Sequence, residues 1–132
     1  MMHKISTEDA PKAIGPYSQG VSVTTLGGQR LIFVSGMLPI DPRTGKMVEG
    51  DIKLLTRQVI LNLDAVLRAD GSQLHNVVRT DVFLKDLKQD FAGMNEEYGQ
   101  WFTGQVAPAR QTIQVADLPM GSRLEISCIA LG

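Results

Sequence analysis

The chain has 132 residues, 43% of them hydrophobic and 20% charged, which is the length and composition of one globular domain spanning residues 1–132. It carries 13 Lys and Arg against 14 Asp and Glu, and this near-neutral balance gives no electrostatic signal of nucleic-acid or membrane-surface binding. A disulfide needs two cysteines and the chain has only Cys128, and its two histidines belong to no metal-ligand cluster, so we expect no metal. No apolar run has the form of a signal peptide or the length of a membrane span, and we therefore expect a cytoplasmic protein.

Glycine and proline divide the first part of the chain into two strands and a turn. Residues 18–25 include an alternation of apolar and polar side chains, which predicts a strand. Gly27-Gly28 tolerates the positive φ of a hairpin turn, and the apolar run 31–35 is typical of the buried strand that returns from it. Residues 41–45, Asp-Pro-Arg-Thr-Gly, have the composition of a further turn.

The first helix has the clearest pattern. The Asp51 carboxylate can cap it, and Gly71 can end it. Between them, apolar residues recur at helical spacing and predict one buried face: Ile52, Leu55, Val59, Leu63 and Val66.

A second helix is expected after a strand at residues 77–84. We expect Asp90 to cap this helix, and Gly104 and Pro108 to close it. Its apolar stripe is more typical of helix core than of an aromatic binding platform, and consists of Phe91, Met94, Tyr98 and Trp101. Two more strands are predicted, at residues 109–116 and 123–131.

The resulting order, ββ-α-β-α-ββ, favours one sheet with both helices on the same face. Two helices leave the opposite face of the sheet uncovered, and the strands place apolar residues on it. In the last strand these are Ile129 and Leu131, or else Ile126 and Cys128. Because an exposed apolar face is usually covered by another molecule, the pattern predicts self-association without giving the number of subunits.

The chain lacks the common catalytic motifs. It contains no Gly-x-Ser-x-Gly element, phosphate-binding loop or dinucleotide-binding sequence. His75 falls between a helix end and a strand, which is typical of a surface residue rather than a catalytic base. Cys128 has no base or positive charge near it in the sequence, and we interpret it as a small buried apolar residue.

Three segments place chemically useful side chains at structured positions. Gly15-Pro16 forces a bend that aims Tyr17, although a packing tyrosine at a strand entry fits the same residues. Pro108-Ala109 places Arg110 at a strand start, where its guanidinium either holds a carboxylate or faces solvent. Glu125 interrupts an apolar strand, which indicates either a desolvated acid–base group with a raised pKa or an outward-facing glutamate.

Five segments in this order resemble the RidA/YjgF family of reactive intermediate deaminases: 14–19 (IGPYSQ), 33–36 (FVSG), 39–45 (PIDPRTG), 108–110 (PAR) and 124–126 (LEI). The segment 95–98 (NEEY) also fits the second helix of that family, and the resemblance covers nearly the whole chain. It implies a chorismate mutase-like (YjgF-like) α/β (α+β) fold with a single mixed sheet. It also implies a homotrimer in which the uncovered sheet faces meet inside and the sites lie in clefts between subunits.

The resemblance further implies a cofactor-independent hydrolase of reactive 2-imino acids and their enamine tautomers. Its substrates would be compounds such as 2-iminobutanoate and 2-iminopropanoate, and its products 2-oxo acids and ammonia. On this basis Arg110 binds the substrate carboxylate, Glu125 orients the attacking water, and the backbone carbonyl of Thr112 holds the same water. The substrate-binding residues that the resemblance implies are Tyr17, Ser35, Gly36 and Asn95.

The chain departs from the family pattern at Met37, where Gln is frequent, at Thr112, where Cys is frequent, and at Ser127, where many members have Glu. These differences bear on substrate preference and on thiol-based regulation.

Two other functions fit parts of the sequence: non-catalytic binding of 2-oxo acids, and a ribonuclease or translation inhibitor. The acidic balance and the absence of a histidine pair argue against the latter. A chorismate mutase would need several cations around its dianionic substrate, and the sequence offers one strong candidate, Arg110.

Overall fold

The computed structural model describes residues 1–132. Its strands are β1 Met2–Ile5, β2 Gly20–Thr24, β3 Arg30–Met37, β4 Ile40–Asp41, β5 Lys46–Met47, β6 Val77–Leu84, β7 Ala109–Gln114 and β8 Leu124–Leu131. Its helices are α1 Ile52–Ala69 and α2 Leu87–Trp101, with short 3-10 turns at Leu74–Asn76 and Pro119–Gly121.

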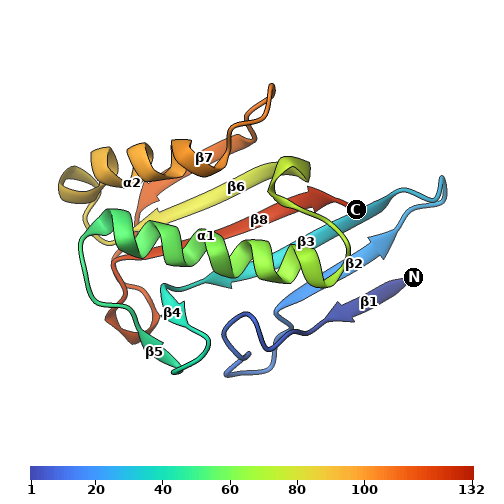
Figure 1. The fold of residues 1–132 in the computed structure, drawn as a ribbon, viewed down its shortest axis with the longest axis horizontal. Coiled ribbons are helices and arrows are strands. Elements are labelled where there is room, and N and C mark those ends of the chain that lie inside the picture. Colours follow the sequence, from blue (N-terminus) through green and yellow to red (C-terminus); the bar gives the residue numbers. More distant parts are fainter.

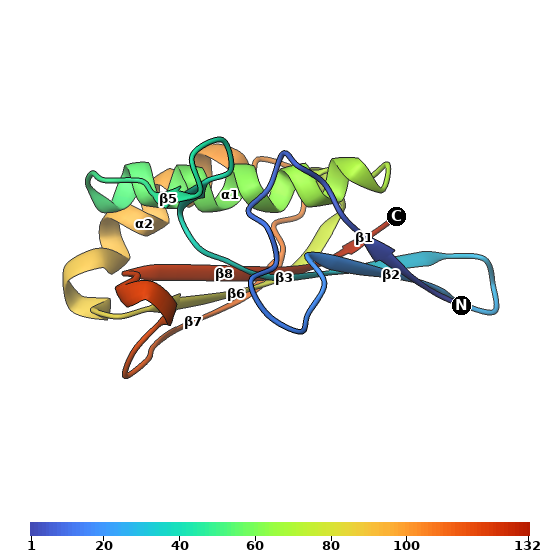
Figure 2. The ribbon, with the colours of Figure 1, turned by 90° about the horizontal axis from the view of Figure 1, so that it is seen from below.

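The main sheet is 6-stranded, in the order β1-β2-β3-β8-β6-β7, and β4 and β5 form a separate hairpin. All neighbouring strands of the main sheet are antiparallel except β6 and β7, which are parallel. Both helices lie on one side of this sheet, and no helix covers the other side (Figures 1 and 2). The predicted mixed sheet with two helices on one face is confirmed.

Helix α1 lies over the middle of the main sheet and closes most of the core. The Asp51 side chain accepts a hydrogen bond from the Leu54 N–H at 3.0 Å, and Gly71 takes a φ of 78° just beyond the helix end. Both ends therefore form as predicted. The apolar side chains expected to face the sheet are all buried: Ile52, Leu55, Val59, Leu63 and Val66.

Helix α2 begins one turn earlier than predicted. Its cap is Asp86, whose side chain accepts a hydrogen bond from the Gln89 N–H at 3.0 Å. Asp90, the predicted cap, lies inside the helix with 1% of its surface exposed, and its carboxylate is 2.6 Å from a guanidinium nitrogen of Arg123. The prediction of Asp90 as the cap is wrong because both aspartates suit that role, and only the tertiary partner Arg123 decides which of them is buried.

The sequence patterns do not indicate β1 or the short strands on either side of the 41–45 turn. Strand β1 has mostly exposed residues and no clear alternation, and it pairs with β2 from Met2 opposite Val23 to Ile5 opposite Gly20. Backbone pairing, rather than a buried apolar face, therefore defines this edge strand. Strands β4 and β5 have only two residues each, which is too short for a periodic signal.

The side of the main sheet without helices, which we name the open face, carries exposed apolar side chains. Ile126 and Cys128 are buried on the helix side, so the alternating residues of β8, Ile129 and Leu131, lie on the open face. Phe33, Ile113 and Leu131 are 42%, 39% and 39% exposed. Apolar side chains gathered on one surface are typical of an interaction site. Neither α1 nor α2 combines the length and the hydrophobicity of a membrane-spanning helix.

Candidate functional site

A cavity of about 350 Å³ lies between the segment that precedes β2 and the strands β3 and β8. We name it the Glu125 pocket. It is lined by four of the predicted site residues, which are Tyr17, Ser35, Gly36 and Glu125. Apolar side chains form much of its wall, among them Ile14, Met37, Leu38 and Ile40. A mostly apolar cavity with a few polar groups is typical of a site for a small molecule.

Gly36 allows the Glu125 carboxyl group to lie against the backbone of β3. A Cβ atom at position 36 would be 2.6 Å from Glu125 Cδ, which is too close for any side chain. The pairing of β3 with β8 is irregular between Val34 and Met37, and Gly36 lies within this irregular stretch. Such irregularities change the direction in which the side chains next to them point. A residue larger than glycine would displace the carboxyl group from the pocket.

Glu125 is the acid–base candidate of the pocket. Its strand neighbours Leu124 and Ile126 are fully buried on the helix side, so the half-buried Glu125 side chain lies on the opposite side of the sheet. Burial keeps water from the carboxyl group and raises its pKa above the ordinary value. The two interpretations left open by the sequence therefore both hold in part: Glu125 faces the side of the sheet without helices, and it is nevertheless partly desolvated there, with a raised pKa. A carboxyl group of this kind can exchange a proton with a bound water.

Buried Gln19 fastens the chain segment that forms the outer wall of the pocket. Its amide nitrogen donates hydrogen bonds to the carbonyls of Thr7, Ala10 and Pro11 at 3.0, 3.2 and 2.7 Å. Its amide oxygen accepts one from the Thr7 N–H at 2.7 Å. The segment therefore has a fixed position over the pocket, because several of its backbone groups bond to one side chain.

Two of the predicted residues are held by local bonds. The Ser35 hydroxyl donates to the carbonyl of Ser18 at 2.6 Å, so it links β3 to the preceding segment. The Ile14 N–H donates to the Tyr17 hydroxyl at 3.3 Å, and the residue as a whole remains 49% exposed. Ser35 thus shapes the pocket wall, while Tyr17 leaves part of its ring free for a ligand.

Two polar residues of the pocket, Gln19 and Lys12, were not predicted from the sequence as site residues. Gln19 ends the IGPYSQ segment, and that position is the signal that could have marked it. Nothing in the sequence marks Lys12, because a lysine among loop residues is ordinarily a solvated side chain.

The remaining predicted residues, Arg110, Thr112 and Asn95, lie away from this pocket. The Arg110 guanidinium carbon is 4.9 Å from the ring centroid of Tyr98 and 5.8 Å from that of Phe91. Asn95 stands one helical turn from both rings on α2. We name this cluster of Arg110, Phe91, Asn95 and Tyr98 the Arg110 shelf.

The aromatic stripe of α2 is therefore core only in part. Met94 and Tyr98 are buried, as predicted, but Phe91 is 38% exposed beneath Arg110. The stripe does act as a platform, for an arginine of the same chain.

Thr112 follows Arg110 on the same side of β7, and its hydroxyl oxygen is buried without a hydrogen-bond partner.

Ion pairing separates Arg110 and Glu125 from the other charged residues. Every other arginine forms a salt bridge, and every other carboxylate that is not exposed belongs to one of these pairs: Arg30–Asp70, Arg43–Asp41, Arg57–Glu97, Arg68–Asp64, Arg79–Asp81 and Arg123–Asp90. Arg110 and Glu125 have no ion-pair partner in the chain. Because a buried or oriented charge ordinarily has a partner, these two groups are candidates for binding a ligand, as is Lys12, which lines the Glu125 pocket and forms no salt bridge.

One chain does not bring the two groups together. Arg110 pairs with Thr80 across β7 and β6, whereas Glu125 pairs with Phe83 across β8 and β6. Paired residues share a face of the sheet, and Thr80 and Phe83 are three positions apart on one strand, so Arg110 and Glu125 lie on opposite faces. The predicted site residues thus fall into two clusters.

Two other candidates, His75 and Cys128, behave as the sequence predicts. His75 is exposed in the 3-10 turn before β6. Cys128 is 3% exposed, and burial raises the pKa of its thiol to about 12, which confirms a small buried apolar residue. No group of three or more His, Cys, Asp and Glu side chains is arranged to hold a metal ion.

Similarity to known proteins covers nearly the whole chain. A family model described as Endoribonuclease L-PSP matches residues 7–132. Protein DfrA of Myxococcus xanthus is 50% identical over 127 residues, which cover 96% of this chain and 93% of that protein. The 2-iminobutanoate/2-iminopropanoate deaminase of Mus musculus is 46% identical over 127 residues, covering 96% and 89%.

The fold is also shared with a solved structure. The YjgF gene product of E. coli superimposes with a TM-score of 0.86 at 40% identity, over 98% of this chain and 98% of that one. The fold expected from the five sequence segments is confirmed, since the main sheet and its two helices follow those of this relative. The chain belongs to the RidA/YjgF family, to which the description Endoribonuclease L-PSP also refers.

Proposed function

We propose that this protein hydrolyses reactive 2-imino acids and their enamine tautomers, such as 2-iminobutanoate and 2-iminopropanoate, to 2-oxo acids and ammonia without a cofactor. The observation that carries the proposal is the pair of partnerless groups, Arg110 and Glu125. A substrate that offers a carboxylate to the arginine and an electrophilic carbon to a water beside the glutamate satisfies both. The name of the mouse relative supports this choice of reaction.

The proposal requires a second copy of the chain, because the two groups lie on opposite faces of one sheet. The exposed apolar residues of the open face, Phe33, Ile113 and Leu131, supply a reason for copies to associate. Arg110 lies on β7, the edge strand of the main sheet, from which it can reach a neighbour. We therefore propose a homotrimer in which the Arg110 shelf of one copy faces the Glu125 pocket of the next.

The proposed reaction uses each group once. Arg110 holds the carboxylate through two parallel hydrogen bonds and so fixes the position of the imine carbon. A water oxygen bonds to the carbon of the protonated imine as the π pair of the C=N bond moves to nitrogen, while the Glu125 carboxylate accepts one water proton and then gives it to that nitrogen. The C–N bond breaks with its electron pair on the departing ammonia, and the hydroxyl proton passes to the Glu125 carboxylate, and from there to solvent, as the C=O bond of the 2-oxo acid forms. The Thr112 carbonyl accepts a hydrogen bond from the attacking water.

The other predicted residues supply contacts on either side of this cleft. We propose Tyr17, Ser35 and Gly36 as substrate contacts in the Glu125 pocket, which they line. We propose Asn95 as a contact from the shelf of the neighbouring copy. The apolar wall that includes Met37 would take the aliphatic side chain of the imino acid.

A coupled assay tests the proposal. A threonine dehydratase generates 2-iminobutanoate in the presence of semicarbazide, which traps the free imine. We expect the wild-type protein at micromolar concentration to lower the trapped fraction, and Arg110→Ala not to do so. Arg43→Ala is the matched control, because this exposed arginine pairs with Asp41 outside both clusters and its loss should leave activity unchanged.

Two outcomes would contradict the proposal. An unchanged trapped fraction, together with saturable binding of 2-oxobutanoate in calorimetry, would show a binding protein without turnover. Cleavage of RNA that survives Glu125→Gln would instead show the activity in the description of the family model.

A further inference from the structure

The Arg110 guanidinium is held by a ring rather than by an acid. It lies 4.9 Å from the ring centroid of Tyr98, close enough for a cation–π contact, and makes no salt bridge. A carboxylate in place of this ring would occupy the guanidinium N–H groups. The ring orients the charge and leaves those donors free for a ligand.

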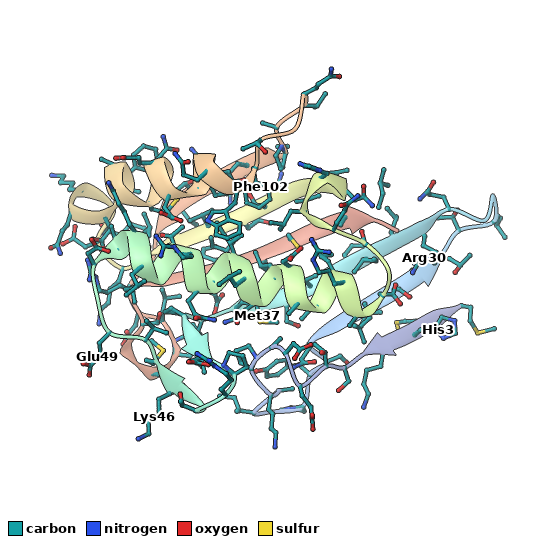
Figure 3. The ribbon with its side chains drawn as sticks, viewed as in Figure 1. His3, Arg30, Met37, Lys46, Glu49 and Phe102 are labelled. Atoms are coloured by element: carbon teal, nitrogen blue, oxygen red, sulfur yellow. The ribbon has the colours of Figure 1, made fainter.

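Tyr98 is itself fixed from two sides. Its hydroxyl forms a hydrogen bond with the Thr80 hydroxyl at 2.7 Å, and Thr80 is fully buried on β6. Its ring stacks on Phe102, with centroids 4.4 Å apart, where α2 ends beside β6 (Figure 3). Thr80 is also the cross-strand partner of Arg110. Each of the three residues Thr80, Tyr98 and Arg110 is therefore in contact with the other two. These contacts restrict the rotation of the Tyr98 ring and keep it beside the guanidinium.

The charge state of Tyr98 suits this arrangement. Burial raises the pKa of its phenol, against the opposing effects of the Thr80 hydrogen bond and the Arg110 charge. The ring therefore remains neutral at physiological pH and does not compete with an incoming carboxylate for the guanidinium.

We propose that Tyr98, anchored by Thr80, is the positioning residue of Arg110 and pre-orients the guanidinium for the substrate carboxylate. This inference rests on the proposed function, in which Arg110 receives that carboxylate. A long arginine side chain loses rotamer freedom when it is fixed by a ligand. Tyr98 orders the Arg110 side chain before the ligand arrives and so reduces that loss. It should therefore strengthen the binding of carboxylate ligands but not that of uncharged ones.

The test compares two ligands of similar shape, the anion 2-oxobutanoate and the neutral 2-oxobutanamide, by calorimetry on the intact protein. Tyr98→Leu removes the ring, and we expect the dissociation constant for 2-oxobutanoate to rise about 5- to 30-fold, the range of a cation–π contact. The constant for the amide should change less than about 2-fold, because the amide does not depend on the charge of Arg110. Trp101→Leu is the matched control: it removes another ring of α2, whose Nε1 donates to Glu97 and which makes no cation–π contact with Arg110.

Tyr98→Phe should rescue most of the loss, since it keeps the ring and removes only the bond to Thr80. Thr80→Val removes the same bond from the other side and keeps the test open if Tyr98→Leu does not fold. We expect either variant to weaken 2-oxobutanoate binding about 2- to 4-fold without affecting the amide, in line with the loss of one neutral hydrogen bond. The double variant Thr80→Val/Tyr98→Phe should be no weaker than either single one.

Two results would overturn the inference: equal weakening of both ligands, which indicates general damage to the fold, or an unchanged constant for 2-oxobutanoate in Tyr98→Leu. Failure of the proposed function looks different. In that case the wild-type protein would bind both ligands equally, or Arg110→Ala would retain wild-type affinity for 2-oxobutanoate, and the role of Tyr98 would fall with it.

Discussion

The Glu125 pocket and the Arg110 shelf each hold one charged group, but in opposite environments. In the pocket, the Glu125 carboxyl lies against the backbone at Gly36, and burial raises its pKa. On the shelf, Arg110 is exposed and rests on aromatic rings. The first arrangement tunes the affinity for a proton, and the second orients a permanent charge toward an anion.

The difference between these two regions and the rest of the molecule is also informative. Elsewhere, arginines and shielded carboxylates neutralise one another, as in the pair of Arg123 with buried Asp90. The charges of such pairs are already neutralised within the chain, so they are not free to bind a ligand. A charge that the fold positions without pairing it is therefore a better indicator of function than the charge itself.

The largest effect is expected from Glu125→Gln. The amide keeps the shape of the side chain and removes its ability to accept a proton, so kcat should fall about 100- to 10,000-fold. Binding of 2-oxobutanoate should change little, since the carboxylate end of the ligand does not touch Glu125. Steady-state kinetics and calorimetry check both statements, and a kcat within a few-fold of wild type would remove the acid–base role.

Arg110→Ala should act on the other half of the comparison. Loss of a desolvated charge pair should raise KM and the dissociation constant for 2-oxobutanoate about 100-fold. Arg110→Lys should recover only part of this, because a lysine cannot form two parallel hydrogen bonds with a carboxylate. Kinetics in which Arg110→Ala and Arg43→Ala behave alike would contradict the role of the shelf.

Stability measurements should separate paired from unpaired arginines. Arg123→Ala leaves the Asp90 carboxylate buried without a partner, and we expect it to lower the free energy of unfolding by about 3 kcal/mol. Arg110→Ala removes no ion pair but removes the cation–π contact with Tyr98, and it should lower the free energy of unfolding by about 0.5 to 1 kcal/mol, the value of an exposed contact of this kind. Urea titrations of both variants at the same protein concentration make the comparison, which fails if Arg110→Ala is the more damaging of the two.

The smallest effect concerns the pH dependence of stability. The pKa of Glu125 is higher in the folded chain than in the unfolded one, so its contribution to stability is full at acid pH and is lost as the pH rises through the folded pKa. Glu125→Gln removes this loss. It should therefore stabilise the protein near neutral pH by less than about 1 kcal/mol, because water still reaches the half-buried carboxyl group and screens its charge. Near pH 4 the two proteins should be equally stable, and a destabilised variant at neutral pH would indicate a hidden partner for the carboxylate.

Much of the fold follows from local patterns. The helical spacing of Ile52 to Val66 and the chemistry of Asp51 and Gly71 predict α1 with both of its ends. The order of elements predicts a single sheet with one uncovered face. The cap of α2 could not be predicted, since the choice between Asp86 and Asp90 depends on Arg123, which is distant in the sequence. Strand β1 was not predicted because it is defined by its backbone pairing with β2, and its side chains show no periodic pattern.

The residues of the candidate site could be proposed from the sequence, whereas the faces on which they lie could not. Arg110 is marked by its place at a strand start after Pro108, and Glu125 by its place in an apolar strand, but strand register places them on opposite faces. The aromatic support of Arg110 was missed because the same stripe also fits a helix core, as Met94 shows. Gly36 gains its meaning only from the distance of a hypothetical Cβ to Glu125, which no sequence pattern contains.

Mixing two inactive variants gives the most direct test of a site shared between copies. Arg110→Ala and Glu125→Gln are each expected to be inactive, but chains of the two kinds, unfolded and reassembled together, form clefts that combine an intact Arg110 with an intact Glu125. With equal amounts, half of each residue is intact and about one cleft in four is complete, so activity should return to about a quarter of wild type. If the mixture remains as inactive as its components while a mixture of wild type with either variant assembles normally, the two groups do not meet across an interface.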